Sequence, residues 1–70
     1  METTNFNSNY IKSVTYDEIT HQLYIRFANG DHYVYYDVMD IDYIGFLSTE
    51  DQNKFINDRL TVKYDSRKLH

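Results

Sequence analysis

Four side chains between residues 24 and 35 have the chemistry needed to bind a nucleic acid. Tyr24 and Arg26 lie two residues apart in one run of alternating side chains, and Tyr33 and Tyr35 lie two apart in the next. Tyrosine rings on an open sheet stack on nucleobases, and a neighbouring arginine contacts phosphates and ring faces. The same rings also fit a structural role, because cross-strand tyrosine pairs stabilise sheets and buried rings fill cores.

The last twelve residues are basic, whereas the rest of the chain is acidic. Residues 59–70 hold four cations and one carboxylate, against three cations and ten carboxylates in residues 1–58. The formal charge of −4 argues against a strongly electrostatic nucleic-acid binder. The basic end suits contact with phosphate or an acidic partner, and it also suits a solvated tail. Its cations complete the candidate nucleic-acid-binding set: Arg59, Lys63, Arg67 and Lys68.

A second candidate surface is acidic and follows the predicted helices. Such a surface could imitate nucleic-acid phosphate and occupy a basic groove on another protein, although acids also simply keep small domains soluble. The candidate protein-interaction residues are Asp37, Asp40, Asp42, Glu50 and Asp51. Separately, Asn57 with Arg59 is a candidate either to hydrogen-bond a ligand or to lock a helix onto the sheet.

Catalytic and metal-binding patterns are absent from the sequence. No serine or threonine is placed with a histidine and a third orienting group, as a nucleophilic site requires. His32 with Asp31 and Asp37 matches no metal-ligand spacing, and there is no glycine-rich phosphate loop. Without cysteine, a disulfide or a thiolate zinc site is excluded. We therefore expect a binding protein without a cofactor, not an enzyme.

The strands that must position these side chains are predicted by alternation. Residues 11–16, 23–28 and 32–38 are rich in β-branched and aromatic side chains. Asn29-Gly30 predicts a hairpin with a two-residue turn, because both residues tolerate positive φ. That register pairs Arg26 with Tyr33, and a single bulge would move one strand's side chains to the opposite face. The predicted core face holds Leu23, Ile25, Phe27, Val34 and Tyr36, and the opposite face holds Tyr24, Arg26, Tyr33 and Tyr35.

Helical signals follow the hairpin. Asp40 is expected to cap a short helix that ends at Leu47, and residues 48–51 to cap a second helix that ends near Leu60. The apolar side chains expected to be buried are Ile41, Ile44 and Leu47 in the first helix, and Phe55, Ile56 and Leu60 in the second. The predicted fold is therefore α+β, a three-stranded antiparallel sheet followed by two short helices, with a short final strand over residues 62–64.

The length of 70 residues predicts one domain. We expect a flexible N-terminal segment over residues 1–9, the folded domain over residues 10–64 and a basic tail over residues 65–70. No signal peptide is visible and no window is long enough to cross a membrane. We therefore expect a cytoplasmic protein with no membrane partner.

The spacing of residues within these elements resembles the KTSC domain over about residues 8–64. The family's central Tyr-x-Tyr stands here as Tyr33-Val34-Tyr35. The chain departs from the family at residues 51–53, where Ser-x-Gly is usual, and at Thr61, where an arginine is usual. The other matching residues are Ser8, Ile11, Ser13, Val14, Tyr16, Asp17, Leu23, Ile25, Phe27, Gly30, Val38, Phe55, Asn57, Leu60 and Tyr64.

This resemblance implies a domain found at the C-terminus of some lysyl-tRNA synthetases and as small stand-alone proteins of bacteria and their phages. RNA binding has been suggested for the family. Our first hypothesis is a module that binds single-stranded nucleic acid or a nucleotide through its aromatic sheet face. The alternative is a protein-interaction module, such as a phage-encoded inhibitor of a host protein, which uses its acidic surface or a sheet edge. Self-association through an open edge would make the monomer a weak homodimer.

Overall fold

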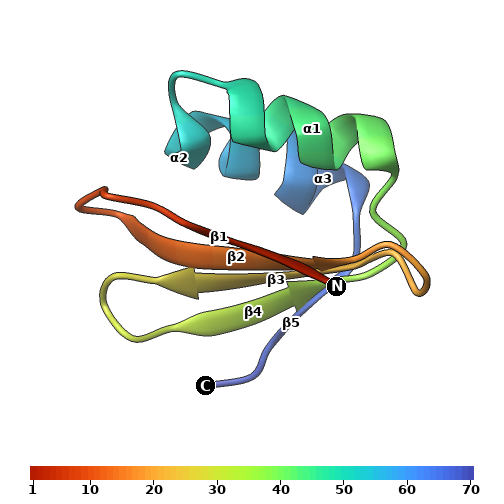
Figure 1. Ribbon diagram of the computed structural model, residues 1–70, viewed down its shortest axis with the longest axis horizontal. Helices are drawn as coiled ribbons and strands as arrows, with labels where there is room; N and C mark the ends of the chain where they lie inside the picture. Colours follow the sequence, from red (N-terminus) through yellow and green to blue (C-terminus); the bar gives the residue numbers. More distant parts are fainter.

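The chain folds into one antiparallel sheet with all its helices on one face, as the computed structural model of residues 1–70 shows (Figure 1). The strands lie in the order β1-β2-β3-β4-β5. The α+β class is confirmed, with five strands in place of three. The strands are β1 (Glu2–Asn5), β2 (Ile11–Asp17), β3 (Gln22–Phe27), β4 (His32–Tyr35) and β5 (Ser66–Lys68). The helical segments are α1 (Asp40–Ser48), α2 (Gln52–Phe55), the π-helical turn η1 (Ile56–Leu60) and α3 (Thr61–Lys63).

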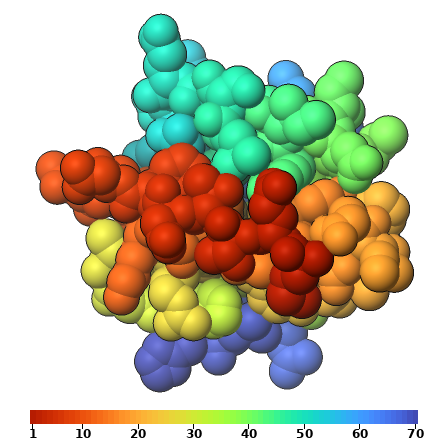
Figure 2. Space-filling view, in the orientation of Figure 1, coloured from red at the N-terminus to blue at the C-terminus, as the bar shows by residue number.

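Both ends of the chain add a strand to the sheet. Residues 1–9, expected to be flexible, contain β1, which pairs with β2; residues 65–70, expected to be a tail, contain β5, which pairs with β4. Figure 2 shows the N-terminal residues lying between the helices and the C-terminal residues. The final strand predicted over residues 62–64 was misplaced, because α3 occupies residues 61–63. Edge strands this short and polar bury little surface, so hydrophobic alternation does not reveal them.

The hairpin between β3 and β4 has a three-residue loop. The Gly30 amide donates to the Phe27 carbonyl (3.1 Å), the Phe27 amide donates to the Asp31 carbonyl (2.8 Å), and Gly30 has φ +99°. These bonds describe a tight turn followed by a glycine bulge. Consequently Ile25 faces Tyr33. The predicted pairing of Arg26 with Tyr33 was wrong by one residue, which turns every side chain of β4 to the opposite face.

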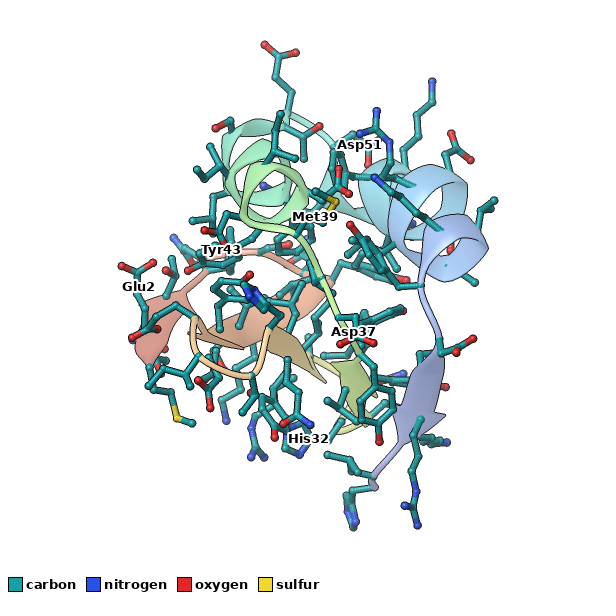
Figure 3. All side chains as sticks on the ribbon, turned by 90° about the vertical axis from the view of Figure 1, so that its right-hand side faces the viewer. Glu2, His32, Asp37, Met39, Tyr43 and Asp51 are labelled. Atoms are coloured by element: carbon teal, nitrogen blue, oxygen red, sulfur yellow. The ribbon has the colours of Figure 1, made fainter.

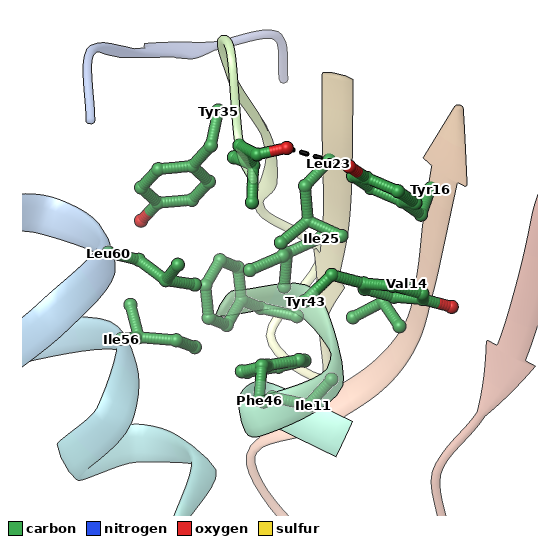
Figure 4. Close-up of a cluster of buried hydrophobic side chains, with 12 residues drawn as sticks. Ile11, Val14, Tyr16, Leu23, Ile25, Tyr35, Tyr43, Phe46, Ile56 and Leu60 are labelled. Carbon is green, nitrogen blue, oxygen red and sulfur yellow. Dashed lines mark hydrogen bonds between the residues drawn. The ribbon is translucent and has the colours of Figure 1, made fainter. Parts of the chain in front are cut away.

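The core lies between the sheet and the helices and is built from twelve buried side chains (Figure 4). Leu23 and Ile25 of β3 are fully buried, as are Phe46 of α1 and Leu60 of η1. Tyr35 is 4% exposed and belongs to this core, whereas Val34 points to the other face of the sheet. The predicted core set was therefore right for β3 and wrong for β4.

Of the three apolar side chains predicted to be buried in α1, only Leu47 packs against the core. Tyr43 and Phe46 face the sheet, while Ile41 is 70% exposed and Ile44 is 59% exposed. The aromatic pair, three residues apart, buries more apolar area than the isoleucine pair with the same spacing. The Tyr43 ring also stacks on Tyr16, with 4.3 Å between ring centroids. The helix cap is Met39, so Asp40, the predicted cap, is instead the first helical residue.

The second helical stretch runs without a break through α2, η1 and α3. The predicted capping segment is confirmed, because the Asp51 carboxylate accepts a hydrogen bond of 3.0 Å from the Lys54 amide. Ile56 and Leu60 are buried, as predicted, and Phe55 packs against the core. None of the helices is long and apolar enough to cross a membrane.

Candidate functional site

The hairpin register separates the four residues predicted to form one binding platform. Tyr24 and Arg26 lie on the sheet face that the helices leave uncovered, whereas Tyr33 and Tyr35 lie on the helix side. Tyr35 is part of the core and Tyr33 packs edge-on against Phe27, with 5.6 Å between ring centroids. The predicted four-residue platform is therefore not formed, although half of it stays available for contact.

The uncovered side of the sheet carries two rows of side chains, which we call the open face. Cross-strand partners project from the same face of a sheet, so the strand pairing defines each row. Figure 3 shows His32 on the side of the sheet away from the helices. The first row consists of Thr3, Thr15, Tyr24, Val34 and Arg67, and the second of Asn5, Ser13, Arg26 and His32.

The open face is basic although the protein is acidic. Its two rows contain two arginines and a histidine, and none of the eleven carboxylates of the chain. The next row begins with Asp17, whose carboxylate accepts hydrogen bonds from the amides of Ile19 (3.0 Å) and Thr20 (3.3 Å). Those bonds lower the pKa of Asp17 and hold its charge in the turn.

A shallow hollow of about 250 Å³ lies on the open face beside Tyr24, Arg26 and His32. The rings of Tyr24 and His32 are 6.2 Å apart, and the Tyr24 hydroxyl donates to Gln22 Oε1 (2.6 Å). Burial, Arg26 and His70 together lower the pKa of His32 below its ordinary value. His32 is therefore mainly neutral at pH 7, and the positive charge of this face comes from the arginines.

The remaining predicted cations lie elsewhere. Arg59 and Lys63 reach the carboxylate of Asp42 in the helical layer, at 3.1 and 2.7 Å. Lys68 lies 3.5 Å from Asp31 on the helix side of the sheet edge. Of the predicted nucleic-acid set, the structure therefore brings together three residues, Tyr24, Arg26 and Arg67. The sequence did not indicate His32 as their neighbour, because the predicted register placed Val34, and with it His32, on the core face.

The predicted acidic surface is not one surface. Asp42 is 2% exposed and paired with cations, and Asp51 caps α2. Asp40 Oδ1 lies 2.7 Å from the Tyr16 hydroxyl. Asp37 and Glu50 are exposed. Asp31, directly before β4, lies beside Lys68, whereas His32 projects from the open face, and no group of three or more potential metal ligands converges.

Asn57 does not lock the helix to the sheet. Its side chain is exposed and donates within the same helical stretch, to Asn53 Oδ1 at 3.1 Å. Asn57 and Thr61 instead line a groove of about 340 Å³ between the helical stretch and the β3–β4 hairpin. We call it the hairpin groove. Its other wall includes Tyr33 and Tyr35, so the two tyrosines absent from the open face meet here.

Comparison with known proteins found a matching family and a similar solved structure. The KTSC domain model matches residues 7–67. The chain belongs to the KTSC domain family. The crystal structure of the KTSC domain protein YPO2434 from Yersinia pestis is similar throughout, with a TM-score of 0.85, 26% sequence identity and coverage of 99% of this chain and 97% of that one. No curated protein matches the chain. The KTSC match includes β2, β3, β4 and η1, which carry most of the open face and the hairpin groove.

Proposed function

We propose that this KTSC domain is a non-enzymatic module whose open face binds single-stranded nucleic acid. The observation that supports the proposal is charge segregation: Arg26 and Arg67 stand in two rows that contain no carboxylate. Phosphate contact depends on the local field, so an acidic protein can bind an anion on a face from which its acids are absent. The overall charge of −4 limits the affinity and does not decide where the ligand lies.

Tyr24 is the residue suited to stack on a base. It sits on β3, the middle strand of the sheet, between Thr15 and Val34. Its hydroxyl is held by Gln22, which reduces the conformational entropy that the ring loses when a base stacks on it. Base–aromatic stacking is worth about 1–3 kcal/mol per base and tolerates any sequence. Binding is therefore expected to be weak and to depend little on sequence.

The arginines set the salt dependence of binding. With two phosphate contacts on a single strand, the logarithm of the association constant falls with the logarithm of salt concentration with a slope of about −1.4. A duplex does not offer unstacked bases to Tyr24, so single strands should bind more tightly than duplexes of the same sequence.

Fluorescence anisotropy with a labelled single-stranded RNA at low salt tests the proposal. Arg26→Glu should weaken binding at least tenfold, and Tyr24→Leu should weaken it about fivefold or more. Lys54→Glu is the matched control, since it makes the same charge change on the exposed surface of α2 and should bind nearly as the wild type does. Equal affinities for the wild type and Arg26→Glu would refute the proposal.

A second candidate function is protein docking through the outer side of α1. Met39, Ile41 and Ile44 are 56–70% exposed there, and a hollow of about 400 Å³ lies among Met39, Ile41, Asp37 and Asp40. Exposed apolar side chains with carboxylates beside them suit a partner with a basic, apolar surface, such as a host protein inhibited by a small phage protein.

Affinity capture from a bacterial lysate tests this candidate. A specific partner should bind the wild type and Val62→Asp, which changes an exposed residue of α3, but not Ile41→Asp. Capture of the same partner by Ile41→Asp would exclude the α1 surface.

A further inference from the structure

The hairpin groove is a second concave site, separate from the open face. Its volume of about 340 Å³ is at the lower end of the range for small-molecule pockets, about 300–1,000 Å³. It lies between the β3–β4 hairpin and the helical stretch, on the side of the sheet opposite Arg26. The two sites therefore share no side chain, and binding at one can be tested without the other.

The apolar wall of the groove is made of aromatic rings that are already fixed in place. Phe27 is 9% exposed, and Tyr10 and Tyr33 both pack edge-on against it, with centroid distances of 5.4 and 5.6 Å. Tyr35, also part of the wall, is buried in the core. Because these rings are held by packing, a flat ligand can stack or pack edge-on against them at little cost in side-chain entropy.

The opposite wall carries polar groups with unused hydrogen-bonding capacity. Asn57 donates to Asn53, but its own side-chain carbonyl oxygen has no partner in the protein. The hydroxyls of Tyr35 and Thr61 are 3.4 Å apart, a long and weak contact. Burial raises the pKa of Tyr35, so its hydroxyl stays protonated and available as a donor. The groove can therefore both donate to and accept from a ligand.

Asn57 lies in the π-helical turn η1, Thr61 directly follows it, and both line the groove. The Thr61 amide bonds to the Ile56 carbonyl, five residues back, so this turn is wider than an α-helical turn. Residues four apart lie on the same side of a helical segment, so both side chains can face the groove. Turns of this kind occur frequently at functional sites.

The charge of the groove disfavours anionic ligands. Asp31 is its only ionisable carboxylate, and its two oxygens contact the Lys68 ammonium (3.5 Å) and the Asn29 amide (3.4 Å). No lysine, arginine or histidine lines the groove. A phosphate or carboxylate would therefore find no partner there and would lie near a negative charge.

We propose that the hairpin groove binds an uncharged, planar heterocycle of nucleobase size, which packs against the tyrosine rings and hydrogen-bonds to Asn57 and Thr61. The tyrosine rings favour a flat ligand, and the Asn57 amide with the Tyr35 and Thr61 hydroxyls favours a ligand with hydrogen-bonding edges. The absence of cationic side chains favours a neutral ligand over an anionic one. The inference does not rest on nucleic-acid binding at the open face.

Titration with adenosine, guanosine, cytidine and uridine, followed by amide chemical shifts, tests the proposal. At least one nucleoside should give saturable shifts at the groove residues Asn29, Asp31, Tyr33, Tyr35, Asn57 and Thr61. Asn57→Ala should weaken that binding about fivefold to tenfold, as expected for one lost hydrogen bond. Asp58→Ala, at the next exposed position of η1, is the matched control and should bind as the wild type does.

Three results would overturn the proposal: no saturation with any of the four nucleosides, shifts confined to the open face, or equal affinities for Asn57→Ala and wild type. The 5′-monophosphate of the bound nucleoside should bind no more tightly than the nucleoside itself. Tenfold tighter binding of the monophosphate would contradict the uncharged ligand. Arg26→Glu should leave nucleoside binding unchanged, so failure of the open-face proposal and failure of this one are distinguishable.

Discussion

The Asp42 carboxylate, only 2% exposed, lies 2.7 Å from the ammonium group of Lys63. Asp42 belongs to α1 and Lys63 to α3, so this ion pair links the first helix of the chain to the last. Arg59 (3.1 Å) and the Tyr64 hydroxyl donate to the same carboxylate. A buried charge costs stability unless it is paired and hydrogen-bonded, and here three donors satisfy it.

Asp42→Asn should destabilise the protein by about 2–3 kcal/mol, because it removes the buried charge that these three donors share. The loss is smaller than for a fully buried triad, since Arg59 and Lys63 are about half exposed and can be hydrated. Urea unfolding measures the change. Asp58→Asn, which neutralises an exposed carboxylate, should alter stability by less than about 0.5 kcal/mol. Equal unfolding midpoints for the two variants would contradict this role of Asp42.

The same carboxylate predicts how stability depends on acid. Burial alone would raise the pKa of Asp42, but hydrogen bonds from Lys63, Tyr64 and Arg59 outweigh it and hold the pKa below the ordinary 3.8. A lowered pKa in the folded state means that the unfolded chain binds the proton first. The contribution of Asp42 is therefore complete above about pH 4 and is lost as the pH falls further.

Urea unfolding between pH 6 and pH 2.5 checks this dependence. Asp17 and Glu18 also have lowered pKa values, so the wild-type profile alone does not isolate Asp42. The informative quantity is the stability difference between wild type and Asp42→Asn. That difference should shrink below about pH 4, and a difference that stays constant with pH would count against the prediction.

The hairpin loop makes a conformational prediction at Gly30. Its φ of +99° disfavours any L side chain, while a Cβ there would meet nothing within 4 Å. Gly30→Ala should therefore destabilise the protein by about 1–2 kcal/mol through backbone strain alone. Gly30→Asn should cost less, because asparagine tolerates positive φ better than alanine. Thermal unfolding measures the stability of both variants. A Gly30→Ala variant as stable as the wild type would contradict this loop conformation.

The same loop shows which part of the candidate site could be predicted from the sequence. Asn29-Gly30 correctly located the hairpin, but the pair occurs both in two-residue turns and in three-residue turns with a bulge. The choice is tertiary: the observed register places Tyr35 in the core with Leu60, whereas the predicted one would turn Val34 toward the helices instead. The strands could thus be predicted, and which tyrosines face solvent could not.

In the helices, too, the sequence did not determine which side chains are buried. Ile41 with Ile44 and Tyr43 with Phe46 are both apolar pairs three residues apart, so spacing alone cannot choose between them. The burial of Asp42 was also invisible, since its partners lie 17 to 22 residues further along the chain. The cap at Asp51 was predictable because its signal is local.

Tyr43 predicts how stability depends on alkaline pH. Its hydroxyl donates to Glu2 Oε1 at 2.6 Å. Burial and this hydrogen bond raise the pKa of Tyr43 to about 12, from an ordinary value of 10.0. The unfolded chain therefore releases the Tyr43 proton first, so this contribution to stability is complete below pH 10 and is lost as the pH rises toward 12.

Unfolding at fixed pH values between 9 and 12 measures that loss. Tyr43→Phe cannot ionise at this position, so its stability should fall less steeply with pH than that of the wild type. Glu2→Gln removes the negative acceptor but leaves the ring buried, and its slope should lie between the other two. Burial also raises the pKa of Tyr16, so part of the alkaline slope should remain in every variant. If Tyr43→Phe and wild type lost stability in parallel, the Tyr43 hydroxyl would have to be more solvated than its bond to Glu2 implies.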